Sequence, residues 1–149
     1  MKKVLITLLA LVALSTAANA QYNNAIGFRL GYGSTAFGSE LSYQGFVSDV
    51  NRIELDFGVN LTRPIGLSAA AIYQWHWFLA GGFGFYVGPG ALAYLSESHF
   101  GLGVGGQIGI DYQFNAPIQL SLDVRPMYGL FGSYVGFNYG ASLGLRYAF

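Results

Sequence analysis

The chain has 149 residues and a formal net charge of zero, with 53% hydrophobic and only 9% charged residues. A soluble domain carries about 25% charged residues, so this composition argues against an ordinary water-soluble domain. The apolar content excludes a disordered chain, and the absence of cysteine excludes a disulfide scaffold or a Cys-based metal site. Nucleic acid is not expected as a partner, because no basic run follows the first three residues.

Residues 1–20 have the pattern of a secretory signal peptide. Lys2 and Lys3 precede an apolar run over 4–14, and Ala18-Asn19-Ala20 supplies the small residues of a cleavage site. The apolar run is shorter than the ~20 residues of a membrane-spanning helix. We therefore expect an exported protein whose mature domain covers residues 21–149.

Two uncharged stretches, 64–96 and 126–145, raise the alternative of membrane helices. The second stretch carries glycines at 132, 136, 140 and 144, the spacing of a helix-packing face. The period argues against helices. From Phe137 to Phe149, apolar residues alternate strictly with small or polar ones, which is the two-residue period of a strand.

The same alternation recurs along the mature chain and predicts eight strands. Their expected ranges are 25–33, 40–44, 52–61, 73–77, 83–94, 102–114, 118–125 and 137–149. Turn residues gather between them, at 34–38, 48–51, 62–66, 80–82, 96–98, 115–117 and 129–133. One face of each strand is rich in Phe, Tyr, Trp and Leu, and the other is glycine-rich or polar. The pattern predicts an all-β fold, an eight-stranded antiparallel up-and-down transmembrane β-barrel with its apolar face in lipid.

Charge placement supports this orientation, because every strand charge falls on the inward face. The expected polar network of the lumen comprises Arg29, Glu40, Arg52, Glu54, Asp56, Gln74, His76, Gln107, Asp111, Asp123, Arg125 and Arg146. The remaining charges of the mature chain, Asp49, Arg63 and Glu97, fall in expected turns. No charge is assigned to lipid, where Arg costs about 2–4 kcal/mol at the midplane.

Several segments resemble the small porin-like outer-membrane β-barrel proteins of Gram-negative bacteria, of the OmpA/OmpX type. They are 51–58, 72–75, 106–112, 117–123 and Arg125-Pro126. The final residues resemble the C-terminal signal of that family, which implies that Leu145, Tyr147 and Phe149 contact the barrel assembly machinery. The resemblance also implies periplasmic termini and outer loops near 34–38, 62–66, 95–98 and 129–135.

Other motifs have simpler explanations. Gly101-x-Gly103-x-x-Gly106 matches a dinucleotide fingerprint, but it continues the strand alternation and no helix follows. His76 has no second metal ligand at a suitable spacing, so we expect a hydrogen-bonded lumen residue. Tyr73, Trp75 and Trp77 fit an aromatic girdle at the membrane interface.

The expected function is structural or interactive, with outer-membrane lipid as surroundings and no cofactor. Two alternatives remain open. The glycine-rich interior and the porin-like resemblance allow a small-solute pore. Ser98 and His99 are residue types used by barrel enzymes that modify lipid A, although neighbours on a strand point to opposite faces.

Overall fold

The computed structural model describes residues 23–35, 38–60, 65–97, 99–132 and 135–149. The predicted signal peptide therefore lies outside the described residues. The strands are β1 (Asn24–Gly33), β2 (Gly38–Phe46), β3 (Asn51–Asn60), β4 (Gly66–Phe78), β5 (Phe83–Ser96), β6 (Phe100–Gln113), β7 (Ile118–Val124), β8 (Met127–Gly132), β9 (Gly136–Asn138) and β10 (Gly140–Ala148). A 3-10 turn, η1 (Ala80–Gly82), joins β4 to β5.

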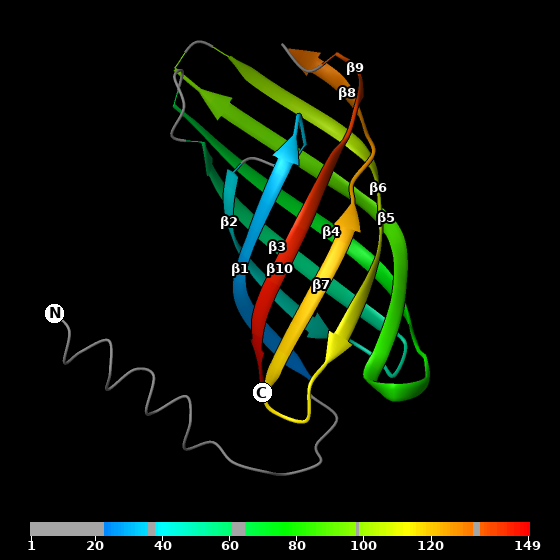
Figure 1. Cartoon of the computed structure of the whole chain (residues 1–149). Helices are drawn as coiled ribbons and strands as arrows, with labels where there is room; N and C mark the ends of the chain where they lie inside the picture. Colours follow the sequence, from blue (N-terminus) through cyan, green and yellow to red (C-terminus); the bar gives the residue numbers. More distant parts are fainter. Residues whose placement is uncertain (1–22, 36–37, 61–64, 98, 133–134) are drawn as a thin grey trace, which may run out of the picture.

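These segments form a closed antiparallel barrel of eight strands (Figure 1). β7 and β8 both pair with β6, and β9 leads into β10. The ten segments therefore occupy eight strand positions around the barrel, each called a stave below. The sheet order is β5-β4-β3-β2-β1-β10-β7-β6-β8-β9, and pairing of β5 with β6 closes it. The start of β1 lies beside the last residue of the chain, where the Asn24 amide donates a hydrogen bond to the Phe149 carbonyl oxygen at 3.0 Å. The predicted all-β fold, an eight-stranded antiparallel up-and-down barrel, is confirmed.

The pairing register fixes the tilt of the strands. In one direction the row of paired residues starting at Leu30 runs through Ser39, Val59 and Leu67 to Leu95. In the other direction it runs through Leu143, Leu122 and Ile110 to Phe85. The two ends lie on the same strand ten residues apart, since 95 minus 85 is 10. A stagger of this size in an eight-stranded barrel corresponds to a strand tilt of about 40°.

Alternation produces the two faces as the sequence predicts. β4 alternates buried and exposed residues along almost its whole length. Some strands are longer than the sequence pattern indicates, because β2 begins at Gly38, β4 begins at Gly66 and β5 reaches Ser96. The expected break at 129–133 is wrong in part, since β8 pairs with β6 as far as Gly132. Gly132 ends that strand with φ of 78°, a conformation that glycine adopts without strain.

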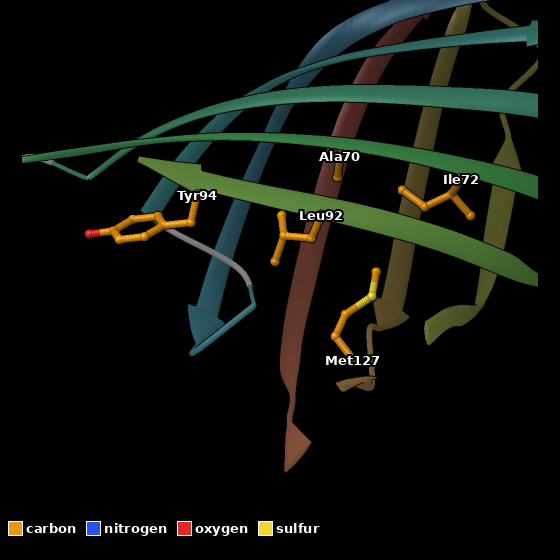
Figure 2. Close-up of a cluster of buried hydrophobic side chains, with 5 residues drawn as sticks. All are labelled: Ala70, Ile72, Leu92, Tyr94 and Met127. Atoms are coloured by element: carbon orange, nitrogen blue, oxygen red, sulfur yellow. The ribbon is translucent and has the colours of Figure 1, made fainter. Parts of the chain in front are cut away.

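The barrel interior has an apolar zone toward the end opposite Asn24 and Phe149. Its buried cluster is Ala70, Ile72, Leu92, Tyr94 and Met127, drawn from β4, β5 and β8 (Figure 2). Glycine allows close approach of backbones around the wall. A Cβ on Gly27 would lie 2.1 Å from the carbonyl oxygen of Leu145, across the β1–β10 seam. Among the described residues, no helix has the length and apolar character to cross a membrane.

Candidate functional site: a charged lumen inside an apolar belt

The strand charges lie together inside the barrel. Arg29 comes from β1, Glu40 from β2, Glu54 and Asp56 from β3, and Arg146 from β10. Arg52, Asp111, Asp123 and Arg125 complete the set, and all nine side chains are buried. Desolvated charges of this kind are stable only when each has a close partner.

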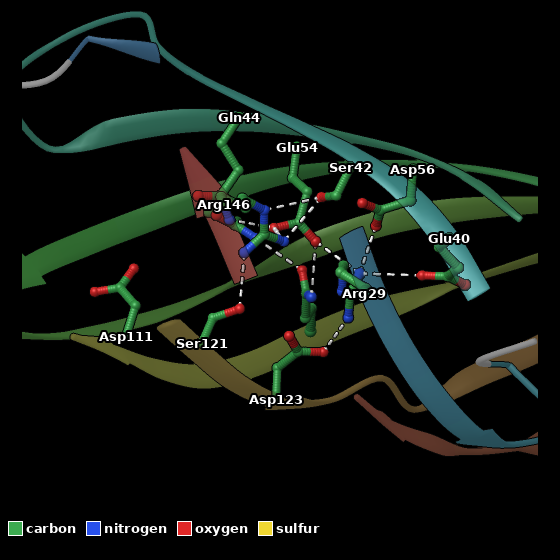
Figure 3. A network of polar contacts seen from close by, with 12 residues as sticks. Arg29, Glu40, Ser42, Gln44, Glu54, Asp56, Asp111, Ser121, Asp123 and Arg146 are labelled. Carbon is green, nitrogen blue, oxygen red and sulfur yellow. Dashed lines mark hydrogen bonds and ion pairs between the residues drawn. The ribbon is translucent and has the colours of Figure 1, made fainter. Parts of the chain in front are cut away.

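Glu54 is the centre of the network (Figure 3). Its carboxylate is 2.9 Å from Arg29 Nη1, 3.1 Å from Arg146 Nη2 and 3.4 Å from Arg125 Nη2. Three amides donate to it as well. Gln107 does so at 2.9 Å and Gln74 at 3.2 Å, and Gln44 is the third donor. One carboxylate thus receives three guanidinium groups and three amide donors.

Around this centre, arginines and carboxylates share partners. Arg29 Nη1 is 2.5 Å from Asp56 Oδ2 and 3.4 Å from Glu40 Oε2, and Arg29 Nη2 pairs with Asp123. Arg125 also pairs with Asp56, and its Nη1 lies 3.7 Å from Glu40 Oε2. Arg29 and Arg125 therefore each contact several carboxylates, so either arginine keeps a partner when one carboxylate is removed.

Arg146 differs, because Glu54 is the one carboxylate that its ion pairs include among the described residues. Its remaining contacts are hydroxyls. It donates to Ser42 at 2.8 Å from Nη2 and to Ser121 at 2.7 Å from Nη1. Glu54 is thus the carboxylate that compensates the buried charge of Arg146.

A second charged group lies toward the end of the barrel where β1 begins at Asn24. Arg52 Nη1 is 2.8 Å from Asp111 Oδ2, and His76 Nε2 is 3.0 Å from Asp111 Oδ1. The Arg52 guanidinium also stacks over two rings, 4.7 Å from the Tyr86 centroid and 5.5 Å from that of Phe46. His76 is therefore a hydrogen-bonded lumen residue. Among the described residues no group of three or more metal-ligating side chains is arranged to hold a metal.

Two glutamines join the two charged groups. Arg52 Nε donates to Gln74 at 2.6 Å, Gln74 Nε2 donates to Gln107 at 2.7 Å, and Gln107 donates on to Glu54. Arg52 and Gln74 are register partners on β3 and β4, whereas the contacts of Gln107 join β6 to β4 and to β3, strands with which β6 does not pair. The contacts therefore cross the lumen and fill it with side chains.

The outer surface of the barrel has the opposite character. Its exposed large side chains are apolar or aromatic on every stave, as with Phe28, Phe57, Ile110, Leu122 and Leu143. The exposed charges among the described residues, Asp49 and Glu97, lie in turns rather than on strands. The barrel wall therefore has charged side chains on its inner face and apolar side chains on its outer face.

Aromatic side chains gather on this surface at the end where β1 begins at Asn24. Tyr73 and Trp75 have ring centroids 5.8 Å apart, and Trp77 stacks on Phe85 at 5.8 Å. Further ring contacts that the sequence reasoning did not single out join Phe83 to Tyr112 and Tyr112 to Phe114, both at 4.7 Å. Their alternation with glycine and polar residues was the available signal.

Other predicted residues are placed as follows. Leu145 and Phe149 are exposed on the outer face of the last stave, and the Tyr147 ring lies 6.2 Å from that of Phe149. Their role in assembly stays a prediction. Ser98 lies outside the described residues, and His99 is exposed in the β5–β6 turn, where its carbonyl accepts the Ser96 amide at 2.7 Å.

The network also contains residues that sequence reasoning did not include. Ser42, Gln44, Ser121 and Tyr86 are buried in the lumen. The Tyr86 hydroxyl donates to Asp123 at 3.0 Å. Ser42, Gln44 and Ser121 occupy inward positions of the alternation, which was a usable signal for them.

No protein-family model matches the chain, and no curated protein matches it. Solved structures do match. Neisserial surface protein A (NspA) aligns with a TM-score of 0.64 and 16% identity over 85% of this chain and 96% of that protein. The N-terminal β-barrel domain of Pseudomonas aeruginosa OprF aligns with a TM-score of 0.63 and 17% identity over 86% and 98%. The chain thus has the fold of the small eight-stranded outer-membrane β-barrels.

Proposed function

We propose that this protein is an integral outer-membrane β-barrel with a side-chain-filled lumen and a structural or interaction role. The observation that carries the proposal is the inverted arrangement of its faces, with nine charges inside a closed barrel and apolar side chains around it. The two solved structures named above belong to outer-membrane barrels, which supports the same location.

The inverted arrangement fits a lipid environment physically. Lipid offers no hydrogen bonds to backbone groups, so a sheet crosses a membrane only when its edges pair and the barrel closes. β5–β6 pairing provides that closure. In water the same molecule would expose aromatic and aliphatic residues on every stave, far beyond the patches of a few hundred Å² usual on soluble monomers.

The filled lumen favours a closed barrel over a pore. Arg52 and Asp111 bridge β3 to β6, and Arg146 reaches from β10 to Glu54 on β3. A solute path along the axis would require several buried ion pairs to separate, and breaking one such pair costs about 3–5 kcal/mol. Catalysis is not part of the proposal, because the described network consists of mutually paired charges.

Fractionation combined with gel mobility tests the proposal. The full-length protein is expressed, cell envelopes are separated, and each fraction is run on a gel with and without boiling. We expect the protein in the outer-membrane fraction, with a mobility that changes on boiling because a closed barrel resists cold detergent. A protein found soluble in the periplasm, with one mobility, would contradict the proposal and identify the apolar face as a core.

A further inference from the structure

The described charges inside the barrel do not balance. The buried arginines of the lumen are Arg29, Arg52, Arg125 and Arg146, and its buried acidic residues are Glu40, Glu54, Asp56, Asp111 and Asp123. Arg63, the other arginine of residues 21–149, falls outside the described residues. With all carboxyl groups ionised and His76 neutral, this lumen has one negative charge in excess. A buried charge without a counter-charge is so costly that the group takes up a proton instead.

The excess belongs to the central group of charges. In the second group, near the start of β1, one arginine faces one carboxylate, since Arg52 lies 2.8 Å from Asp111. The glutamines that join the two groups carry no charge. The central group has three guanidinium groups and four carboxyl groups, and its members are Arg29, Arg125, Arg146, Glu40, Glu54, Asp56 and Asp123. One of these four carboxyl groups is therefore the expected place for a proton.

Two of the four are held as anions by donors of their own. Glu54 receives three guanidinium groups and three amides. Asp123 receives Arg29 at one oxygen and the Tyr86 hydroxyl at the other, the latter at 3.0 Å. A proton on either carboxyl group would turn an acceptor oxygen into a donor that faces other donors. Glu40 and Asp56 remain.

Glu40 and Asp56 lie side by side on the inner face of the wall. In the β2–β3 register Asp56 opposes Ser42 and Glu40 opposes Gly58, which makes the two acids diagonal neighbours. Both reach the same atom of Arg29, as Figure 3 shows. Its Nη1 lies 2.5 Å from Asp56 Oδ2 and 3.4 Å from Glu40 Oε2. These two oxygens are therefore at most 5.9 Å apart, the sum of the two distances.

The surroundings favour one negative charge on this pair rather than two. Arg125 contacts both acids, so the pair shares its two arginines. The charged groups around the pair come from β1, β3, β7, the β7–β8 junction and β10, and they are Arg29, Glu54, Asp123, Arg125 and Arg146. Asp56 Oδ1 is buried and accepts no hydrogen bond in the part of the chain that the structure describes. Two carboxyl groups in one buried site repel each other when both are ionised, which favours a proton on one of them.

We propose that Glu40 and Asp56 together bind one proton in the folded protein at neutral pH. The shared proton leaves four carboxylates for the four buried guanidinium groups of the described lumen. The site requires the closed barrel alone, so the inference goes beyond the proposed membrane location.

Proton uptake during refolding tests the proposal. The protein is purified from outer membranes, unfolded in urea and diluted into detergent micelles in weak buffer that contains a pH indicator. At about pH 8, free carboxyl groups are ionised and free histidines are neutral. Folding that creates the shared site therefore withdraws a proton from the solution. Unboiled gel samples give the folded fraction, and the uptake is expressed per folded barrel.

Glu40→Gln and Asp56→Asn each remove one carboxyl group of the pair and keep its shape. We expect the unchanged protein to take up about one proton per folded barrel more than either variant. Glu97→Gln, in an exposed turn, is the matched control and is expected to take up as much as the unchanged protein. Equal uptake by the unchanged protein and both lumen variants would overturn the proposal.

His76→Gln tests the other place that a proton would balance the lumen. His76 lies 3.0 Å from Asp111, and a proton on its ring would also cancel the excess charge. We expect His76→Gln to retain the uptake. Uptake that is lost in His76→Gln and retained in Glu40→Gln would place the proton on the imidazole and refute the shared pair.

Infrared spectroscopy of the unchanged protein keeps the test decisive if a variant fails to fold. The folded barrel at the same pH, in a detergent without carbonyl groups, is expected to show the C=O stretch of a protonated carboxyl group. A spectrum without that band contradicts the proposal. A barrel that shows the boiling shift but neither the band nor the uptake refutes the proton site alone and leaves the proposed function intact.

Discussion

Replacing Glu54 by glutamine removes the centre of the lumen network while keeping its shape. The change replaces one acceptor oxygen by an amide that donates hydrogen bonds, in a place where three guanidinium groups already donate. Arg29 and Arg125 keep their contacts with Asp56, so their charges stay partly compensated. Arg146 retains only hydroxyl partners among its described contacts.

The magnitude follows from this difference among the three arginines. One guanidinium loses its carboxylate, which corresponds to one broken buried pair and about 3–5 kcal/mol of unfolding free energy. The assay is equilibrium urea unfolding of the barrel in phospholipid vesicles, followed by Trp fluorescence. Glu97→Gln, in an exposed turn, is the matched control and is expected within about 0.5 kcal/mol of the unchanged protein.

A double variant sharpens the test. Adding Arg146→Gln to Glu54→Gln removes the guanidinium charge that Glu54→Gln leaves without a carboxylate. The losses of unfolding free energy in the two single variants are therefore expected to sum to clearly more than the loss in the double variant. A Glu54→Gln loss below about 1 kcal/mol, or simple additivity with Arg146→Gln, would refute the reasoning that Glu54 holds the network together.

Three further predictions concern the wall, the lumen and the outer turns. Gly27→Val is expected to block closure of the barrel and to abolish the boiling shift, because its Cβ would lie 2.1 Å from the Leu145 carbonyl oxygen. Gly103→Ala is expected to retain the shift, because its Cβ would come no closer than 3.3 Å, to the Tyr128 carbonyl oxygen. A normal shift for Gly27→Val contradicts this prediction. Pure protein in planar bilayers is expected to give no reproducible single-channel steps, and regular steps would instead establish a pore. Cells carrying the variant with Ser98→Ala and His99→Ala are expected to have the same lipid A mass spectrum as cells carrying the unchanged protein. A change in lipid A mass that the unchanged protein causes and the variant does not would establish an enzyme.

Alternation in the sequence was sufficient to predict the strands and the face of each strand that carries the charged side chains. Arg52, Glu54 and Asp56 interleave with Ile53, Leu55 and Phe57, and a strand must send these two sets to opposite faces. The structure places the charged set in the lumen. Composition then distinguished the faces, because the apolar face was richer in large side chains than a soluble surface permits.

Alternation was insufficient where both faces are apolar or small. Ile72 and Leu92 point into the lumen although neighbouring outward residues are apolar too, so the inner apolar zone had no clear signal. The extension of β8 to Gly132 was missed because Pro126 and Gly129 are typical turn residues. Pairing partners across the lumen, such as Arg52 with Asp111, depend on the stagger of the whole barrel, which no local pattern contains.

Spin labels on single cysteines measure the orientation of the two faces most directly. Leu122→Cys places a label on the outer face of β7, and Glu97→Cys places one in an exposed turn. The protein in phospholipid vesicles is examined by electron paramagnetic resonance with lipid-soluble oxygen and a water-soluble nickel chelate as colliders. We expect the label at 122 to collide with oxygen and not with the chelate, and the label at 97 to show the reverse. A label at 122 as accessible to the chelate as the label at 97 would contradict the membrane barrel.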